Sequence, residues 1–590
     1  MMSALQTWTR SLVVGMWMLA ISGSLAGVTR ADDKGQAKLD EASSLKLEAN
    51  TPAKLGKVVE LCEQALSEGL DEANTTYAKQ LLAASALEKS KLKVQQLPRV
   101  AQDERSLRRL KSELASDLKK AIDNDPSLAE AHVLATQVSM LPPADKAEAL
   151  DHVNKAIELL KDTPSEQSAG YMLRARLQTE PSEQLKDYQL ATKADPKNMA
   201  AWQLQIALQV SIGKLDEAYA DIQTLLTNDE DNEFAIEAAF QILAKMKKYD
   251  DLLGLLDKQI ENKPKESVYH RLRATALIIK SAEKNDKELL AKARVDLDKA
   301  VELNSRDAQS LILRSQVLFD LGEIEQARRD IGDALLIEPT AIDGVFMRAA
   351  IAAREKRYSD AIADMELLVR AFPTREGYVR QLASYYQLDD RPRLAIRLLD
   401  ELDKKNKASW RSLRMRGDAR LSVGEHSEAI RDYERAIAVI EKQGGATEPT
   451  KNETNKDEPP AEDESDTSAP SDEYAGLLNN LAWVLATSPK DEIRNGKRAL
   501  ELGLKACELT EYKEAHILST LAAGYAETGD FPKAREWSTK AVELGTAEEN
   551  EQIEQLKKEL ESYKVDKAWR EEQQTEENKK PRAKSETIET

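Results

Sequence analysis

The feature that most constrains this chain of 590 residues is an internal repeat of 34 residues. In each copy a short polar run leads to a small apolar residue that opens a helical stretch, as in Gly322-Glu-Ile-Glu-Gln-Ala327. From Ala218 to Leu252 is one step of 34 residues, and the next steps are 41, 34, 34, 34 and 34, marked by Leu252, Ala293, Ala327, Ala361, Ala395 and Ala429. A period of this length indicates stacked copies of one supersecondary unit, so the chain is expected to be a repeat array.

Each repeat reads as two amphipathic helices. Leu311, Ser315 and Leu318 share one helical face, and Ala327 and Ile331 share a face of the second stretch. Small residues recur at one position of the first helix, where they allow close helix approach: Ala274, Ser315, Ala349, Ala383, Gly417, Ala482 and Ala522. We therefore predict an all-α fold of helical hairpins.

These residues resemble the tetratricopeptide repeat (TPR), a helix–turn–helix unit of 34 residues. Consensus positions are matched at Trp202, Tyr249, Tyr358, Phe531, Ala327, Ala334 and Pro339, whereas Gln205 departs from a consensus leucine. The resemblance covers most of 110–440 and about 474–545, and it implies an α-solenoid, a superhelix of antiparallel helix pairs. Two segments, Leu478–Pro489 and Thr520–Asp530, resemble secreted bacterial proteins of this repeat class.

The first thirty-one residues have the pattern of a secretory signal peptide. Arg10 precedes an apolar run from Leu12 to Ser22, and Thr29-Arg30-Ala31 offers small residues for cleavage after Ala31. We expect a periplasmic or secreted protein without a transmembrane segment in the mature chain. An uncleaved membrane anchor remains the alternative.

The remaining chain divides by composition. We predict an N-terminal degenerate repeat region at 32–110, a main TPR array at 111–440, a C-terminal TPR block with a capping helix at 474–565 and a polar tail at 566–590. Residues 441–473 hold three lysines and eleven acidic residues, a net charge of −8, and are expected to be a disordered linker. An acidic docking segment is the alternative. The seven extra residues of the 41-residue step, near 280–287, are expected to form a polar loop.

Motifs for chemistry are missing from the sequence. There is no P-loop, GxSxG or HExxH, and the two cysteines, Cys62 and Cys507, form no CxxC pair. The five histidines are assigned to different repeats, without metal-ligand partners: His132, His152, His270, His426 and His516. A net charge of −19 argues against nucleic acid. We expect no enzyme activity, no cofactor and no metal.

A binding surface is implied by the resemblance, because the first helix of each TPR lines the concave side. The inward positions carried onto this chain are Gln309, Ile312, Gln316, Phe319, Phe346, Arg380, Gln387, Arg411, Arg414, Asn479 and Trp483, together with Ser384, His516 and Ser519. Three of them, Arg380, Arg411 and Arg414, could receive an acidic segment. The alternative is that these arginines pair with neighbours such as Asp389 or Asp418.

The function predicted from these features is an extracytoplasmic scaffold that binds peptide or protein segments in the groove and is not catalytic. Two alternatives stay open. One is a structural or assembly component of the cell envelope, and the other is a regulatory relative of a TPR-bearing glycosyltransferase that lacks the catalytic domain. The sequence does not define the oligomeric state.

Overall fold

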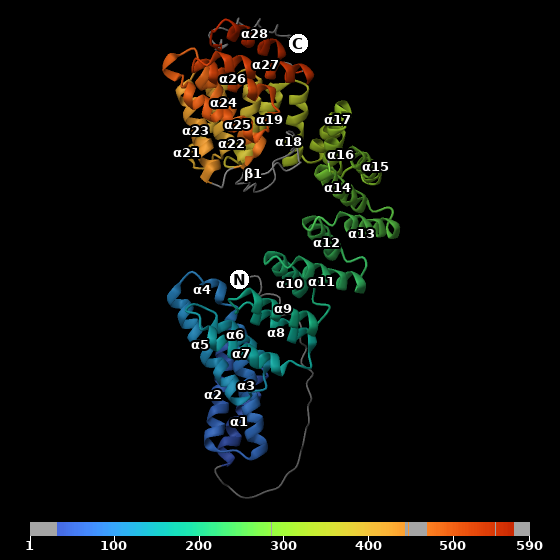
Figure 1. Ribbon diagram of the computed structural model, residues 1–590. Coiled ribbons are helices and arrows are strands. Elements are labelled where there is room, and N and C mark those ends of the chain that lie inside the picture. Colours follow the sequence, from blue (N-terminus) through green and yellow to red (C-terminus); the bar gives the residue numbers. More distant parts are fainter. Residues whose placement is uncertain are drawn as a thin grey trace, which may run out of the picture. The chain divides into compact units, whose positions relative to one another are not determined.

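The computed structural model describes residues 32–284, 286–442, 446–447, 469–548, 550 and 552–571. The predicted signal peptide, most of the predicted acidic linker and the tail beyond Glu571 lie outside the described residues. The chain divides into two compact units, one up to Lys247 and the other from Lys248 onward. Figure 1 labels the elements along the chain.

The first unit consists of helices. Their bounds are α1 Asp32–Lys46, α2 Pro52–Glu68, α3 Glu72–Val94, α4 Leu97–Val100, α5 Glu104–Asn124, α6 Ala129–Ser139, α7 Lys146–Leu159, α8 Pro164–Ala175, α9 Pro181–Ala194, α10 Met199–Ser211, α11 Leu215–Asn228 and α12 Glu233–Lys245. In α2, Val58, Cys62 and Ala65 are buried along one side, as expected for the second helix of a hairpin.

The second unit continues the helical pattern. Its helices are α13 Tyr249–Asn262, α14 Ser267–Lys284, α15 Lys287–Leu303, α16 Ala308–Asp320, α17 Ile324–Ile337, α18 Ile342–Arg354, α19 Tyr358–Ala371, α20 Glu376–Leu388, α21 Pro392–Lys404, α22 Trp410–Ser422, α23 His426–Lys442, α24 Ser471–Thr487, α25 Gly496–Leu509, α26 Ala515–Glu527, α27 Phe531–Ala547 and α28 Ile553–Lys564, with a 3-10 turn at Asp491–Ile493. Among the described residues, the only strands are β1, Ala446–Thr447, and β2, Ala469–Pro470, which pair in parallel. The predicted all-α, TPR-like fold is confirmed.

The turn inside several hairpins places one residue in the left-handed backbone region. Gly322 and Gly424 occupy this position with φ values of 83° and 81°, and two repeats between them place Lys356 and Asp390 there, both at 62°. Glycine adopts this conformation without steric cost, so the Gly of the sequence pattern marks the turn between the two helices.

Close packing explains the small residues of the first helix. A Cβ atom built on Gly417 of α22 would lie 2.6 Å from the ring of Tyr433 in α23, closer than any real contact allows. Ser315 of α16 donates a hydrogen bond of 2.8 Å to the backbone oxygen of Ala327 in α17. The predicted role of these positions in helix approach therefore agrees with the structure.

The predicted polar loop near 280–287 is wrong. Helix α14 runs to Lys284 and α15 begins at Lys287, so these helices are 18 and 17 residues long, whereas the next hairpin has helices of 13 and 14. The extra residues are mainly lysine, alanine and glutamate, which favour helix. Lys280 also forms an ion pair of 2.6 Å with Asp250 at the start of α13.

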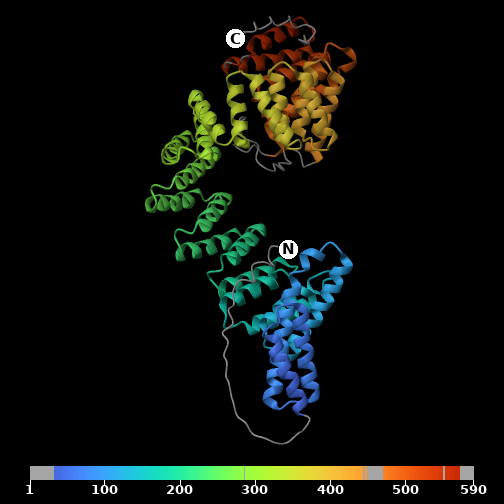
Figure 2. The same ribbon diagram turned by 180° about the vertical axis from the view of Figure 1, so that it is seen from behind.

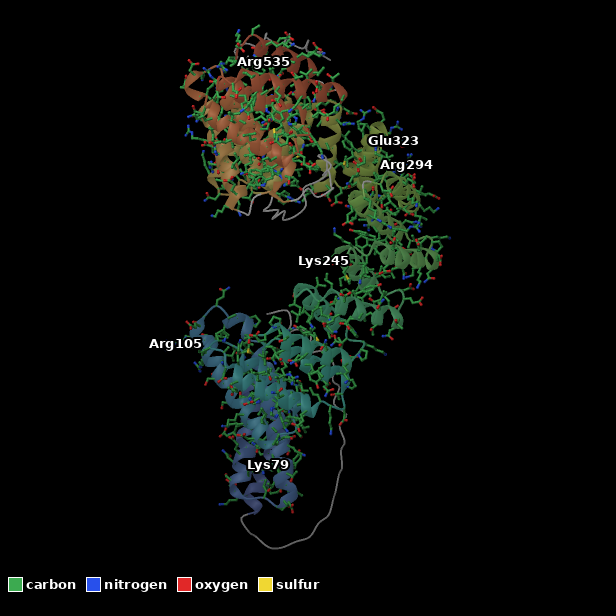
Figure 3. The ribbon with its side chains drawn as sticks, viewed as in Figure 1. Lys79, Arg105, Lys245, Arg294, Glu323 and Arg535 are labelled. Atoms are coloured by element: carbon green, nitrogen blue, oxygen red, sulfur yellow. The ribbon has the colours of Figure 1, made fainter. Side chains whose placement is uncertain are left out.

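Consecutive hairpins are also tied by charge. Figure 3 labels Arg294 in α15 and Glu323 at the start of α17, whose side chains form an ion pair.

Both cysteines are buried and unpaired, and burial raises the pKa of Cys62 to about 11 and that of Cys507 to about 12. Among the described helices, none is long and apolar enough to span a membrane.

Candidate functional site

A recurring ion pair joins the two helices of several hairpins. An arginine in the first helix binds an aspartate sixteen residues later in the second helix through two of its nitrogens. The Nε–Oδ2 distances are 2.6 Å for Arg314–Asp330, 2.8 Å for Arg348–Asp364 and 2.8 Å for Arg416–Asp432. We call these the hairpin ties. Bidentate pairs of this kind fix side-chain geometry strongly.

Most of these arginines also reach the preceding hairpin. Arg314 donates to Asp298 at 3.1 Å, and Arg416 donates to Asp400 at 2.8 Å, in each case with Nη1. The residue at the corresponding position for Arg348 is Gly332. The Arg348 side chain is 46% exposed, against 20% for Arg314 and 4% for Arg416. The hairpin ties therefore link neighbouring repeats wherever the second aspartate is present.

In other hairpins of the second unit, the arginine and the aspartate are both replaced by apolar residues. The α20–α21 hairpin has Leu382 and Leu398 at these two positions, and both pack in the hydrophobic core. In the C-terminal helices the same positions are also apolar, with Leu481 and Leu502 buried together. Paired replacement avoids leaving one buried charge without its partner, which is costly. The arginines of the hairpin ties thus serve the fold.

Several predicted groove residues contribute to the fold as well. Ile312, Phe319 and Phe346 are 5%, 8% and 2% exposed and lie in the core that α16–α21 form together. Gln309 is exposed and Gln316 is partly buried. Gln387 donates a hydrogen bond of 3.3 Å to the backbone oxygen of Met415.

The three predicted groove arginines contact acidic residues or backbone of their own chain. Arg411 forms an ion pair with Glu473 at 3.2 Å, and Arg414 reaches the backbone oxygen of the same residue at 3.5 Å. Arg380 lies 3.9 Å from Glu376, one helical turn away. These direct contacts are not with Asp389 or Asp418, the two neighbours named from the sequence, although the charge of Arg414 acts on Asp418. Arg411 is thus neutralised within its own chain, as the alternative from the sequence also assumes. A carboxylate of a partner protein would have to displace Glu473 in order to bind Arg411.

A cavity of about 1110 Å³ lies among the C-terminal helices of the second unit. The first helices of three hairpins, α22, α24 and α26, contribute to its wall, and residues of α23, of α28, of the segments before and after α28 and the residue that follows α24 complete it. Figure 2 shows these helices from behind, in orange to red. Its polar lining residues are Asp418, Ser422, His426, Tyr433, Asn479, Asn480, Trp483, Thr487, Ser488, His516, Ser519, Thr520, Asn550, Gln552, Gln555, Glu559 and Glu571. Of the eleven predicted groove residues in the main set, Asn479 and Trp483 line this cavity, together with the accessory positions His516 and Ser519.

Hydrogen bonds fix part of the cavity wall. Asp418 accepts from the hydroxyl of Tyr433 at 2.7 Å and from the amide of Asn480 at 3.1 Å. Elsewhere in the wall, Glu559 of α28 accepts from the hydroxyl of Ser519 and from the amide of Gln555, the latter at 3.0 Å. Polar groups that line the cavity therefore link α22 to α23 and α24, and α26 to α28.

The segment after α28 folds back onto this site. Its backbone joins α24 through a 3.0 Å bond from the Glu571 nitrogen to the Thr487 oxygen, and the indole of Trp483 donates to the Glu571 carboxylate. Arg570 forms an ion pair of 2.6 Å with Glu527 of α26. Arg535, labelled in Figure 3, forms an ion pair of 2.6 Å with Asp566. The segment thus carries Glu571 into the cavity wall.

The carboxylates of the cavity are poorly compensated. Burial raises the pKa of Asp418, Glu559 and Glu571 above their usual values. Arg414 acts against this shift at Asp418, whereas Glu571 adds to it at Glu559. Burial also lowers the pKa of His516, so this ring favours its neutral form. No lysine or arginine is among the lining residues in the described part of the chain.

Two buried acceptors in the wall lack a hydrogen-bond donor among the described residues. Asn479 is 8% exposed, and its Oδ1 atom has no partner. His426 is 4% exposed, and its Nδ1 lies 2.8 Å from the Gly424 oxygen, which can only accept. In the tautomer that donates from Nδ1 to this oxygen, Nε2 is an acceptor, and no described residue donates to it. Buried polar atoms are normally paired, so both atoms are candidates to accept a hydrogen bond from a ligand.

Sequence reasoning missed most of this wall. Glu559 lies within the apolar stripe of the capping helix, between Leu556 and Tyr563, and a lone glutamate on a buried stripe is a signal that could have been followed. Glu571 gave no such signal, because it belongs to a charged segment. Asp418 was named only as a neighbour for arginine.

One histidine assignment is wrong. His132 in α6 and His152 in α7 were placed in different repeats, but they belong to one hairpin, with their Nδ1 atoms 3.2 Å apart. Burial lowers the pKa of His132. Among the described residues, no three histidine, cysteine or acidic side chains are grouped as a metal site would require.

Comparison with known proteins gives distant similarities. No family model matches the chain. The DnaJ homolog subfamily C member 3 of Bos taurus is 23% identical over 338 residues, which are 54% of this chain and 61% of that protein. The Mus musculus protein of the same name is 24% identical over 255 residues, 38% and 49% of the two chains. The chain thus spans about half to three-fifths of the length of these relatives.

The solved structures that match this chain are also only distantly similar to it. Yeast Tom70 is 14% identical with a TM-score of 0.35 and covers 91% of this chain and 96% of its own. Cut9 in the APC/C hetero-tetramer Cut9–Hcn1 is 13% identical with a TM-score of 0.36 and covers 90% and 96%. The TPR-like fold rests on the repeated hairpins themselves, and such a scaffold is typical of protein–protein interaction.

Proposed function

We propose that this protein is an extracytoplasmic scaffold that binds a segment of a partner protein in the cavity between α22, α24, α26 and α28, and that it carries out no chemistry. The observation that carries the proposal is the cavity itself. Its wall holds buried acceptors, Asn479 Oδ1 and His426 Nε2, for which the described part of the fold provides no donor. Polar groups placed in a cleft fix the orientation of a ligand, and these two acceptors are in position to do so.

The location of the cavity supports a protein ligand. Three first helices of successive hairpins contribute to it, and stacked repeats present such helices as an extended binding surface. A volume of about 1110 Å³ is enough for several side chains of an extended segment. The extracytoplasmic part of the proposal rests on the pattern of residues 1–31, and N-terminal sequencing of the secreted protein should begin at Asp32.

Site-specific photo-crosslinking tests the binding site. A benzoylphenylalanine probe in place of Ser422 of α22 or Gln552, just before α28, should capture the same partner from envelope extract, because both residues line the cavity. Lys557 of α28 is the matched control, because its side chain is exposed, lies outside the lining and pairs with Glu554. Equal capture from Lys557, or different proteins captured from the two cavity positions, would contradict the proposal.

The acidic partner expected from the arginines is a separate and finer proposal. It requires a partner carboxylate to take the place of Glu473 beside Arg411. The double variant Arg411→Glu/Arg414→Glu should then weaken capture of the partner. Unchanged capture would discard the arginine site and leave the cavity proposal standing.

A further inference from the structure

We infer that the cavity receives a basic side chain, lysine or arginine, of the bound protein segment. The inference deepens the proposed function and rests on it. It starts from the chemistry of the wall, in which the groups left for a ligand are hydrogen-bond acceptors and carboxylates. A ligand that complements such a wall has to bring N–H donors and positive charge.

The first observation concerns charge. Glu559 and Glu571 lie in the wall, and neither forms an ion pair with a lysine or arginine among the described residues. Arg570 is next to Glu571 in sequence, but its guanidinium is paired with Glu527. A buried carboxylate without a counter-ion is unfavourable, and the raised pKa of both groups reflects this. The charge of Glu571 acts on Glu559, so a cation placed beside these two carboxylates would relieve both.

The second observation is independent of charge. Asn479 Oδ1 and His426 Nε2 are buried acceptors without donors, on α24 and α23. An aliphatic ammonium has three hydrogens to donate and a guanidinium has five, and neither group accepts. A carboxylate or phosphate ligand would instead meet further acceptors and further negative charge. The wall therefore selects a basic side chain against an acidic one.

A peptide-binding measurement tests the inference. Three fluorescein-labelled nonapeptides alternate alanine with lysine, glutamine or glutamate, and their binding to the full chain is followed by fluorescence anisotropy at about 0.15 M salt, where distant surface charges are screened. We expect the lysine peptide to bind at least about tenfold tighter than the glutamine peptide. One additional charge-assisted hydrogen bond is enough to produce a difference in affinity of this size. The glutamate peptide should bind most weakly.

Matched variants separate the cavity from the acidic surface of the protein. Glu559→Gln and Glu571→Gln keep the shape of the side chains and should each lower the affinity for the lysine peptide several-fold. Glu554→Gln, on the same helix but outside the lining, should leave it unchanged. Asn479→Leu removes the buried acceptor at similar volume and should also weaken binding, with circular dichroism as the check on folding.

The inference is overturned if the lysine peptide does not bind, if the glutamine or glutamate peptide binds as tightly, or if Glu554→Gln weakens binding as much as Glu559→Gln. None of these results decides the proposed function, because the crosslinking experiment reads binding at the cavity whatever the ligand charge. Failure of the two proposals is therefore distinguishable.

Discussion

The hairpins from Ala308 to Lys442 and the helices from Ser471 to Lys564 use polar side chains differently. In three of the four hairpins of the first region, the arginine of the first helix binds an aspartate of the second helix, so its charge is neutralised within the fold. In α24 and α25 of the second region the same positions are leucines, and neighbouring polar residues of the first helices, such as Asn479 and Ser519, face a cavity to which α22 and α23 also contribute. Charge on a repeat is thus a poor guide to where a ligand binds.

The most damaging change to the first region should be Arg416→Leu. Arg416 is 4% exposed and binds Asp400, Asp403 and Asp432, so its removal leaves buried carboxylates undercompensated. We expect a local loss of about 3–5 kcal/mol, as for other broken buried pairs.

Hydrogen exchange of the α22 and α23 amides measures this loss. The control is Arg431→Leu, which removes an exposed ion pair with Glu428 in α23 and should cost about 0.5 kcal/mol or less. Similar losses in the two variants would show that the ties do not stabilise the hairpins.

Replacing both partners of one hairpin tie should convert a hairpin with an arginine–aspartate pair into one with a leucine pair. Replacing Arg314 and Asp330 together by leucine copies the natural pair Leu382 and Leu398. Each single replacement should cost about 2–3 kcal/mol by leaving one partner unpaired, whereas the double variant should lie within about 1 kcal/mol of the parent. Hydrogen exchange in α16 and α17 gives the coupling energy. Additive losses would mean that the two positions are not exchangeable as a pair.

Acid should weaken the first region selectively. Hydrogen bonds from Arg435 and Arg416 lower the pKa of Asp403 from 3.8 to about 2. Because the folded pKa is depressed, the stabilisation is full above the unfolded value near 4 and is lost as the pH falls from about 4 to 2, at a cost of about 1–2 kcal/mol. Asp403→Asn should remove this part of the acid sensitivity in thermal unfolding measured over that range. The same pH dependence in the variant would refute the assignment.

The variant with the smallest expected effect adds the second aspartate that the hairpin tie of Arg348 lacks. Arg348 lacks the second aspartate that Arg314 and Arg416 have, because that position is Gly332, and a Cβ there meets open space. Gly332→Asp should stabilise α17 and α18 by about 0.5 kcal/mol beyond Gly332→Asn, which matches aspartate in shape and helix propensity but lacks the charge. Hydrogen exchange of these helices measures the difference, and no gain over the asparagine variant would argue against a bridging role.

The repeat pattern predicted the fold in detail, because spacing and small residues report backbone geometry. The turn at Gly322 and the close approach at Gly417 both follow from it. The insertion near 280–287 was misjudged because polarity was read as a loop, although the same residues are good helix formers.

The residues of the site were harder to predict from the sequence than the fold was. Asn479 and Trp483 were found because their positions in the repeat carry over from TPR proteins, and both line the cavity. Glu559 and Glu571 come from the terminal helix and the segment after it, where no repeat register applies. The arginines were singled out by charge, but their partner Glu473 lies at the end of an acidic stretch that gave no register with α22.

The most direct test of the central claim is hydrogen–deuterium exchange of the full chain with and without the crosslinked partner's binding segment. The account predicts increased protection in α24, α26 and α28, and no change in the helices from α16 to α21. Protection that is confined to α16–α21, around Arg380 and Gln387, would contradict it.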